Sequence, residues 1–103
     1  MAEAKKYEFK PMYSEVAELG KILAHPARIM ILDILAKENR CVTDLVAKIP
    51  LSQSTISQHL KVLKNSNLID FEVESNRNAY CLNKKKLSQL SQLLKKTLTN
   101  VLT

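Results

Sequence analysis

The sequence predicts a mainly α-helical fold with one small β-hairpin, and three observations support this. Apolar residues recur at helical spacing over most of the chain and change to a period of two only after residue 67. At 103 residues, the chain has room for one domain. The hydrophobic fraction of 46% is ordinary for a packed domain and too high for a disordered chain. We therefore expect a flexible N-terminal arm over residues 1–13 and one domain over residues 14–103.

Two helices are predicted in the first part of the domain. The first begins near Ser14, a candidate N-cap, and continues through apolar residues at helical spacing to Leu23. Pro26 interrupts this helix and can start the next one, because proline is tolerated in a first helical turn. The second helix, which ends near Leu35, is apolar almost all round. Such a helix is expected to lie in the core.

Two short helical patterns follow, separated by Pro50. The first runs from Thr43 to Ile49, with Thr43 or a neighbour as its cap. The second begins at Ser52, a good N-cap, and continues to about Asn65. Its apolar stripe consists of Ile56, Leu60 and Leu63, which we expect to face the core.

The period-two region predicts a hairpin. Residues 68–74 and 79–82 are expected to form its strands, around the polar turn of residues 75–78. A last helix is expected from Asn83 to about Val101, with a stripe of leucines along one side. Four helices, a β wing and then a fifth helix are typical of the winged helix-turn-helix fold.

The net charge of +6 lies in one part of the chain. Residues 75–103 contain Arg77 and five lysines but no acidic residue, and residues 45–69 carry only basic charges. Phosphate binding needs a local excess of cations, so these regions favour a polyanionic partner. A solvated basic surface would give the same composition.

The helix that begins after Ser52 has an unusual outward face. On a helical wheel its hydroxyl, amide and lysine side chains point away from the apolar stripe, and no carboxylate interrupts them. Such side chains can contact base edges and phosphates in a major groove, whereas a generic surface helix mixes Glu with Lys. The predicted contacts are Gln53, Ser54, Thr55, Ser57, Gln58, Lys61 and Lys64. Arg77, near the tip of the hairpin, is predicted to reach a minor groove or the backbone.

Three stretches resemble the arsenical-resistance-repressor (ArsR-type) family of metal and redox sensors, and the resemblance covers about residues 15–95. Leu23 to Arg28 resembles the family's L-x-x-P-x-R segment, and Cys41 to Leu45 resembles its C-V-C-D-L segment. Leu51 to Leu63 is similar to the family's recognition helix almost residue for residue. The resemblance implies a sequence-specific transcriptional repressor that binds operator DNA as a homodimer and is released from the DNA by an inducer. It also implies that the first and last helices form the dimer interface. Two-fold symmetry then predicts a pseudo-palindromic operator.

The leucine stripe of the last helix also favours a dimer. Leu87, Leu90, Leu94 and Val101 repeat at three-four spacing, and Leu98 widens the stripe. One small domain cannot easily cover so broad a stripe, so part of it is expected to face a second subunit.

The sensing sites of the family are incomplete in this chain. The paired thiolates of its soft-metal site are absent, because Thr43 stands where the second cysteine would be. Its zinc-type site needs Asp, Glu and His on the last helix, and residues 84–103 contain none. No metal or cofactor site is predicted, and the inducer, if one exists, is unknown.

Cys41 and Cys81 are the remaining candidate sensing residues. The segment before the third helix is expected to pair with the second strand of the wing, which would bring the two thiols close together. They could then form a disulfide or a persulfide bridge, or bind a soft metal ion. Alternatively, both are small apolar packing residues, as free cysteines commonly are.

The remaining residue types exclude several functions. His59 lies at the edge of the predicted core and is expected to pack or bond structurally, and His25 is expected to cap or fill the turn before Pro26. We find no catalytic motif, which argues against an enzyme, and no apolar run of membrane-spanning length. The expected location is the cytoplasm. The competing hypothesis is a winged-helix module that binds proteins and has lost DNA binding.

Overall fold

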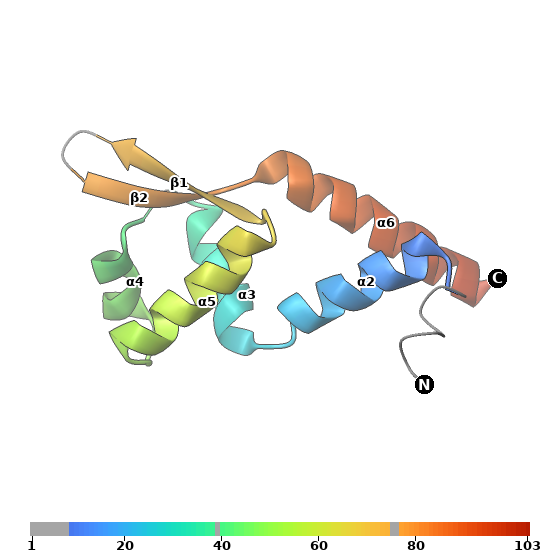
Figure 1. Ribbon diagram of the computed structural model, residues 1–103, viewed down its shortest axis with the longest axis horizontal. Helices are drawn as coiled ribbons and strands as arrows, with labels where there is room; N and C mark the ends of the chain where they lie inside the picture. The colour runs from blue at the N-terminus through green and yellow to red at the C-terminus, as the bar shows by residue number, and fades with distance from the viewer. Residues whose placement is uncertain (1–8, 39, 75–76) are drawn as a thin grey trace.

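The computed structural model describes residues 9–38, 40–74 and 77–103. In these residues it contains five helices and one antiparallel hairpin, as predicted (Figure 1). The elements are α2 (Pro11–Ile22), α3 (Pro26–Leu35), α4 (Val42–Lys48), α5 (Gln53–Asn65), β1 (Ile69–Glu74), β2 (Arg77–Leu82) and α6 (Lys84–Leu102). No helix in the described ranges is long and apolar enough to cross a membrane.

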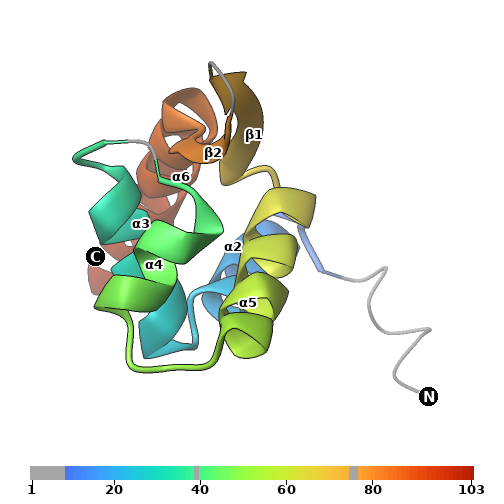
Figure 2. The ribbon, with the colours of Figure 1, turned by 90° about the vertical axis from the view of Figure 1, so that its left-hand side faces the viewer.

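The elements form a body with a two-helix extension. Helices α3, α4 and α5 pack together beneath the hairpin, whereas α2 and α6 pack on each other and extend away from that body (Figures 1 and 2). Figure 2 shows α4 and α5 in front, joined by a short loop. This helix pair and the hairpin beside it are the winged helix-turn-helix arrangement.

The core lies inside the body. Its largest fully buried side chains are Ile31, Leu45, Ile56, Leu60, Leu63, Leu68 and Ile69. The predicted stripe of α5 accounts for three of them, so its inward face is confirmed. Helix α6 has no buried residue along its 19 residues.

Two expectations about the first helices are wrong. Helix α2 begins at Pro11, with Lys10 as N-cap in an extended conformation, and not at Ser14. The fixed φ of proline suits a first helical turn, and this preference outweighs the serine cap. Helix α3 starts at Pro26 as predicted, but it is not enclosed all round, because Ile29 and Met30 are 52% and 39% exposed. The predicted N-terminal arm mostly lies outside the described residues.

The ends of α5 are fixed by local hydrogen bonds. The Ser52 hydroxyl accepts a hydrogen bond from the backbone N–H of Thr55 at 3.2 Å, which confirms the predicted N-cap. At the other end, Asn67 has a φ of 63°. The backbone N–H of Leu68 donates to the Leu63 carbonyl, and that of Asn67 to the Lys64 carbonyl, both at 3.0 Å. This Schellman motif places Leu68 against Leu63 and turns the chain directly into β1.

The hairpin is tighter than predicted. Strand β2 begins at Arg77, which pairs with Glu74, and not at Ala79. The pairing continues regularly from there to Ile69 and Leu82. The polar residues at 77 and 78 therefore extend the strand, because backbone pairing does not require an apolar side chain.

Candidate nucleic-acid interface

The outward face of α5 is accessible. Among the predicted contact residues on this helix, Thr55 is half-buried. The others are exposed: Gln53, Ser54, Ser57, Gln58, Lys61 and Lys64. They project from a helix whose opposite side is sealed in the core by Ile56, Leu60 and Leu63. The backbone of this face is therefore rigidly placed, while its polar side chains face solvent.

The hydroxyl groups at the start of α5 are partly engaged with one another. Ser52 donates a hydrogen bond to the Thr55 hydroxyl at 2.9 Å, and its oxygen lies 3.2 Å from that of Ser54. Thr55 therefore contributes to the cap as well as to the outward face. Gln58 and Lys61 lie beyond this network, in the middle of the helix.

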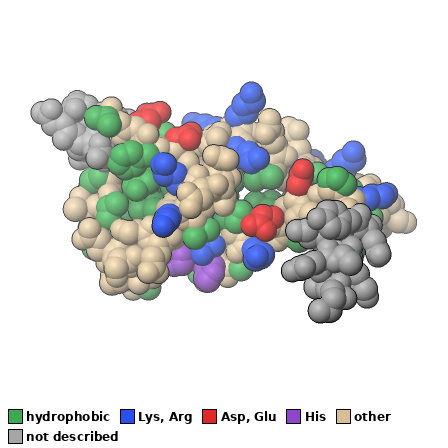
Figure 3. Space-filling view, viewed as in Figure 1, with side chains coloured by type: hydrophobic (Ala, Val, Ile, Leu, Met, Phe, Trp, Pro, Cys, Tyr) green, Lys and Arg blue, Asp and Glu red, His purple; other side chains and the backbone are tan. Residues whose placement is uncertain are grey.

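The charges at this end of the molecule are separated. In the view of Figure 3, Lys and Arg side chains lie over α5, whereas Asp and Glu side chains lie over the hairpin. The exposed carboxylates of the hairpin include Asp70 and Glu72 on β1. The sequence reasoning missed this acidic face, although the alternation of Asp70, Glu72 and Glu74 was a signal for it. The backbone of Arg77 lies in β2, and its side chain is outside the description.

Helix α5 is tied to the rest of the body by a polar contact that the sequence did not reveal. Arg28 Nε on α3 donates a hydrogen bond to Nδ1 of His59 at 3.0 Å, and Arg28 Nη1 donates to the carbonyl of Ile22 at 3.1 Å. The predicted structural role of His59 is thereby confirmed. His25, the residue before Pro26, lies with its ring centroid 5.4 Å from that of His59. Residues 31 positions apart in sequence meet here, and neither period nor spacing indicated it.

The predicted pairing of the segment before α4 is confirmed. Arg40 and Tyr80 form an antiparallel bridge, with backbone hydrogen bonds of 3.1 and 2.7 Å. Cys41 and Cys81 each follow one member of this bridge and are both free. They thus occupy diagonal positions, for which Cα atoms lie about 7–8 Å apart. A disulfide needs about 4.4–6.8 Å, so a direct bond would require backbone movement.

Each thiol has its own neighbours. Cys41 Sγ donates to Asp44 Oδ2 at 3.1 Å and lies 3.0 Å from Thr43 Oγ1, at the start of α4. Cys81 Sγ donates to the Asp70 carbonyl at 3.7 Å. Burial raises the pKa of the Cys81 thiol, and the carboxylates of Glu72 and Asp70 raise it further. The described part of the chain contains no group of three His, Cys, Asp or Glu side chains arranged for a metal ion.

Comparisons with known proteins agree with this geometry. The profile of the family described as "Bacterial regulatory protein, arsR family" matches residues 25–70. An HTH-type transcriptional regulator of Mycobacterium tuberculosis, Rv0081, is 34% identical over 96 residues, which are 92% of this chain and 84% of that protein. The arsenical resistance operon repressor of Staphylococcus xylosus is 34% identical over 82 residues, covering 80% of this chain and 79% of the repressor.

Solved structures give the same result. The crystal structure of Rv0081 matches with a TM-score of 0.70 and covers 91% of this chain and 95% of its own. The homodimeric winged helix-turn-helix DNA-binding domain of Mb0332 from Mycobacterium bovis matches with a TM-score of 0.65 at 28% identity. The match covers 88% of this chain and 84% of the Mb0332 chain. From the helix-turn-helix, the wing and these relatives together, the chain belongs to the ArsR family of DNA-binding transcriptional regulators.

Proposed function

We propose that this protein is a repressor that binds a pseudo-palindromic operator as a homodimer, with α5 in the major groove of each half-site. The observation that carries the proposal is the outward face of α5, which is exposed, free of carboxylates and held by a buried apolar stripe. Amides such as Gln58 can address base edges, and Lys61 can contact phosphates or guanine. Arg77 stays a predicted contact of the wing.

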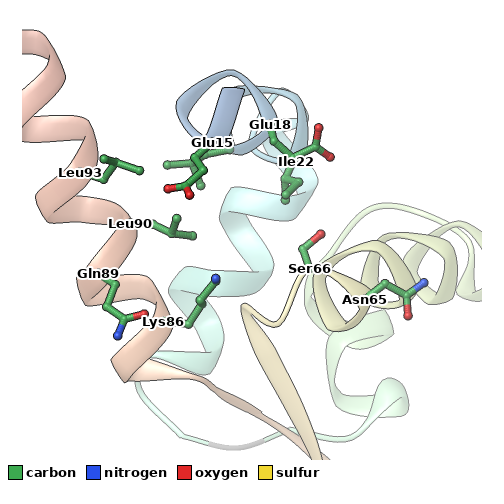
Figure 4. Close-up of a pocket in the computed structure, with 10 residues that line it drawn as sticks. Glu15, Glu18, Ile22, Asn65, Ser66, Lys86, Gln89, Leu90 and Leu93 are labelled. Carbon is green, nitrogen blue, oxygen red and sulfur yellow. The ribbon is translucent and has the colours of Figure 1, made fainter. Parts of the chain in front are cut away.

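The α2–α6 extension supports the dimer. Leu98 and Val101 of α6 are 52% and 75% exposed, and Tyr13 of α2 is also exposed. A cavity of about 660 Å³ separates parts of the two helices, with Leu90, Leu93 and Ile22 turned toward it (Figure 4). The two helices thus leave apolar surface unburied within one chain, and a second copy with the same surface would cover it about a two-fold axis.

The proposal leaves the inducer open and keeps the cytoplasm as the expected location. A sensing role for Cys41 and Cys81 stays a prediction. Both thiols are partly accessible, but they face different partners, and the raised pKa of Cys81 does not favour a reactive thiolate.

A double substitution on α5 tests DNA recognition. We expect Gln58→Ala with Lys61→Ala to weaken binding to the intergenic DNA upstream of the protein's own gene by about tenfold or more, because a lost base contact costs about 1–3 kcal/mol. Binding is measured by fluorescence anisotropy over a range of salt concentrations, and subunit mass by light scattering. The matched control is Gln92→Ala with Lys95→Ala, which makes the same changes at exposed positions of α6.

The outcomes separate the hypotheses. Weaker binding by the α5 variant alone, with its dimer intact, supports the proposal. If the α5 variant binds the DNA as tightly as the α6 control variant, α5 is not the recognition helix. If the wild-type protein binds no DNA sequence specifically, a protein-binding role becomes the better hypothesis.

A further inference from the structure

A small polar cluster joins the recognition helix to the helices that precede it. Arg28 of α3 lies at its centre and donates in two directions, to the Ile22 carbonyl at the end of α2 and to Nδ1 of His59 on α5. One side chain thereby connects three helices. The guanidinium can do this because it presents several N–H donors in a fixed plane.

The contact between Arg28 and His59 requires a neutral imidazole. Arg28 has only donors, so Nδ1 of His59 must carry a lone pair and the ring proton must lie on Nε2. Protonation of Nδ1 removes the acceptor and places a second cation 3.0 Å from the guanidinium nitrogen. Protonation thus breaks the hydrogen bond and turns the attraction between Arg28 and His59 into repulsion between two cations.

The surroundings of the cluster do not offset such a charge. From α3, the group that faces His59 is Arg28, and from the turn before α3 it is His25, with ring centroids 5.4 Å apart. A cavity of about 430 Å³ beside the cluster is also lined by Lys21 and Glu18 of α2, and Glu18 is the one carboxylate among its lining residues. Burial lowers the pKa of His59 from its usual value near 6.5, and the charges of Arg28 and His25 lower it further.

We propose that Arg28 and His59 form a positioning pair that holds α5 in its DNA-binding orientation only while His59 is neutral, so that operator affinity falls at acidic pH. This inference rests on the proposed function, because it concerns the orientation of the same recognition helix. His59 itself is half-buried and lies away from the outward face that carries Gln58 and Lys61. Its effect on DNA is therefore exerted through the position of α5.

The expected sign distinguishes this pair from a general effect of acid. Protonation of histidines near DNA adds positive charge and strengthens binding to phosphates. A positioning pair predicts the opposite, a weaker complex at low pH. Each unit by which DNA binding lowers the pKa of His59 changes the affinity by at most about tenfold.

The experiment compares the ratio of the Kd at about pH 5.5 to the Kd at about pH 7.5, at constant ionic strength, for four proteins. For the wild type we expect a ratio of about two to ten. His59→Asn keeps an acceptor near the position of Nδ1 but does not titrate, and Arg28→Lys removes the two-directional donor. Both are expected to bring the ratio close to one or below it. His25→Gln removes the neighbouring imidazole, whose charge lowers the pKa of His59, but keeps the Arg28–His59 pair, so its ratio is expected to stay above one.

A measurement on the free wild-type protein tests the contact itself. The nitrogen chemical shifts of His59 are expected to show a proton on Nε2 at neutral pH and a pKa below 6.5. The thermal midpoint is expected to fall as the pH decreases through about 6.5, because the unfolded chain then binds the proton before the folded one does. Below the pKa of the folded state this loss is complete.

Several results would overturn the inference. A wild-type ratio retained in His59→Asn or in Arg28→Lys would show that the pair does not carry the pH dependence. A wild-type ratio below one, or a proton on Nδ1 of His59, would contradict it directly. Absence of specific binding at neutral pH would instead contradict the proposed function, and the nitrogen shifts would still decide whether the contact exists.

Discussion

At the scale of single residues, Cys81 illustrates how its neighbours set its chemistry. It pairs with Asp70 across the hairpin, and Glu72 lies two pairs further along β1, on the same face of the hairpin as Asp70. Burial and these two carboxylates disfavour the thiolate, which is the form that attacks oxidants and binds soft metals. A sequence with two cysteines left both sensing and packing open, and the environment of Cys81 favours low reactivity.

Reaction with iodoacetamide tests this environment. In a Cys41→Ser background, where Cys81 is the remaining thiol, we expect alkylation at neutral pH to be slower than for an unstructured cysteine peptide. Its rate should rise at a higher pH than that of the peptide. Glu72→Gln removes one of the carboxylates and is expected to lower the thiol pKa and accelerate the reaction, whereas Glu15→Gln on α2 should not. A rate above that of the peptide would instead support Cys81 as a reactive sensor.

At the scale of elements, the junction between α5 and β1 fixes how the wing is placed beside the recognition helix. Asn67 adopts the left-handed conformation there, and its neighbour Leu68 is fully buried against the core. Glycine adopts this conformation without a steric penalty, asparagine tolerates it, and alanine is disfavoured by about 1 kcal/mol or more. The junction therefore depends on the residue type at one position.

Two substitutions at Asn67 are expected to differ in their effect on the free energy of unfolding. Asn67→Ala should lower the free energy of unfolding by about 1 kcal/mol, and Asn67→Gly should leave it equal or raise it slightly. Urea unfolding at fixed protein concentration measures both. Asn65→Ala, at the last helical position of α5, is the control and should not destabilise the protein, because alanine is a better helix former. Equal losses for Asn67→Ala and Asn67→Gly would show that the asparagine side chain, and not its backbone, matters.

The sequence predicted elements well where local and long-range forces agree. In α5, the Ser52 cap, the apolar period and burial of the stripe all favour the same helix, and the predicted extent, from Ser52 to about Asn65, agrees with the observed one. At the start of α2, two local signals competed, and Pro11 prevailed over Ser14. The pairing of Arg28 with His59 was not predictable, because it depends on how α3 and α5 cross, and no periodicity encodes a crossing angle.

At the scale of the whole molecule, the shape indicates an incomplete unit. The radius of gyration is 15.9 Å and the extents are 48 × 29 × 23 Å. A compact domain of about 100 residues has a radius of gyration of about 13 Å. Helices α2 and α6 contribute to this elongation, because they project from the body formed by α3, α4, α5 and the hairpin (Figure 1). This elongated shape is explained if α2 and α6 pack against the same helices of a second copy at the centre of a dimer. The two α5 helices would then lie on either side of that centre, one for each half-site.

Leu98 tests this arrangement, because it is 52% exposed on the leucine stripe of α6. In a two-fold interface each substitution is made twice, and burial of one leucine contributes about 1.5 kcal/mol or more. Leu98→Glu is therefore expected to weaken the dimer by about a hundredfold or more, measured by sedimentation equilibrium. Thr99→Glu adds the same charge on the opposite side of α6 and should leave the dimer intact. If Leu98→Glu remains dimeric, the subunits associate through another surface. If it becomes a folded monomer, its affinity for a full operator should fall, because a monomer cannot bind both half-sites at once.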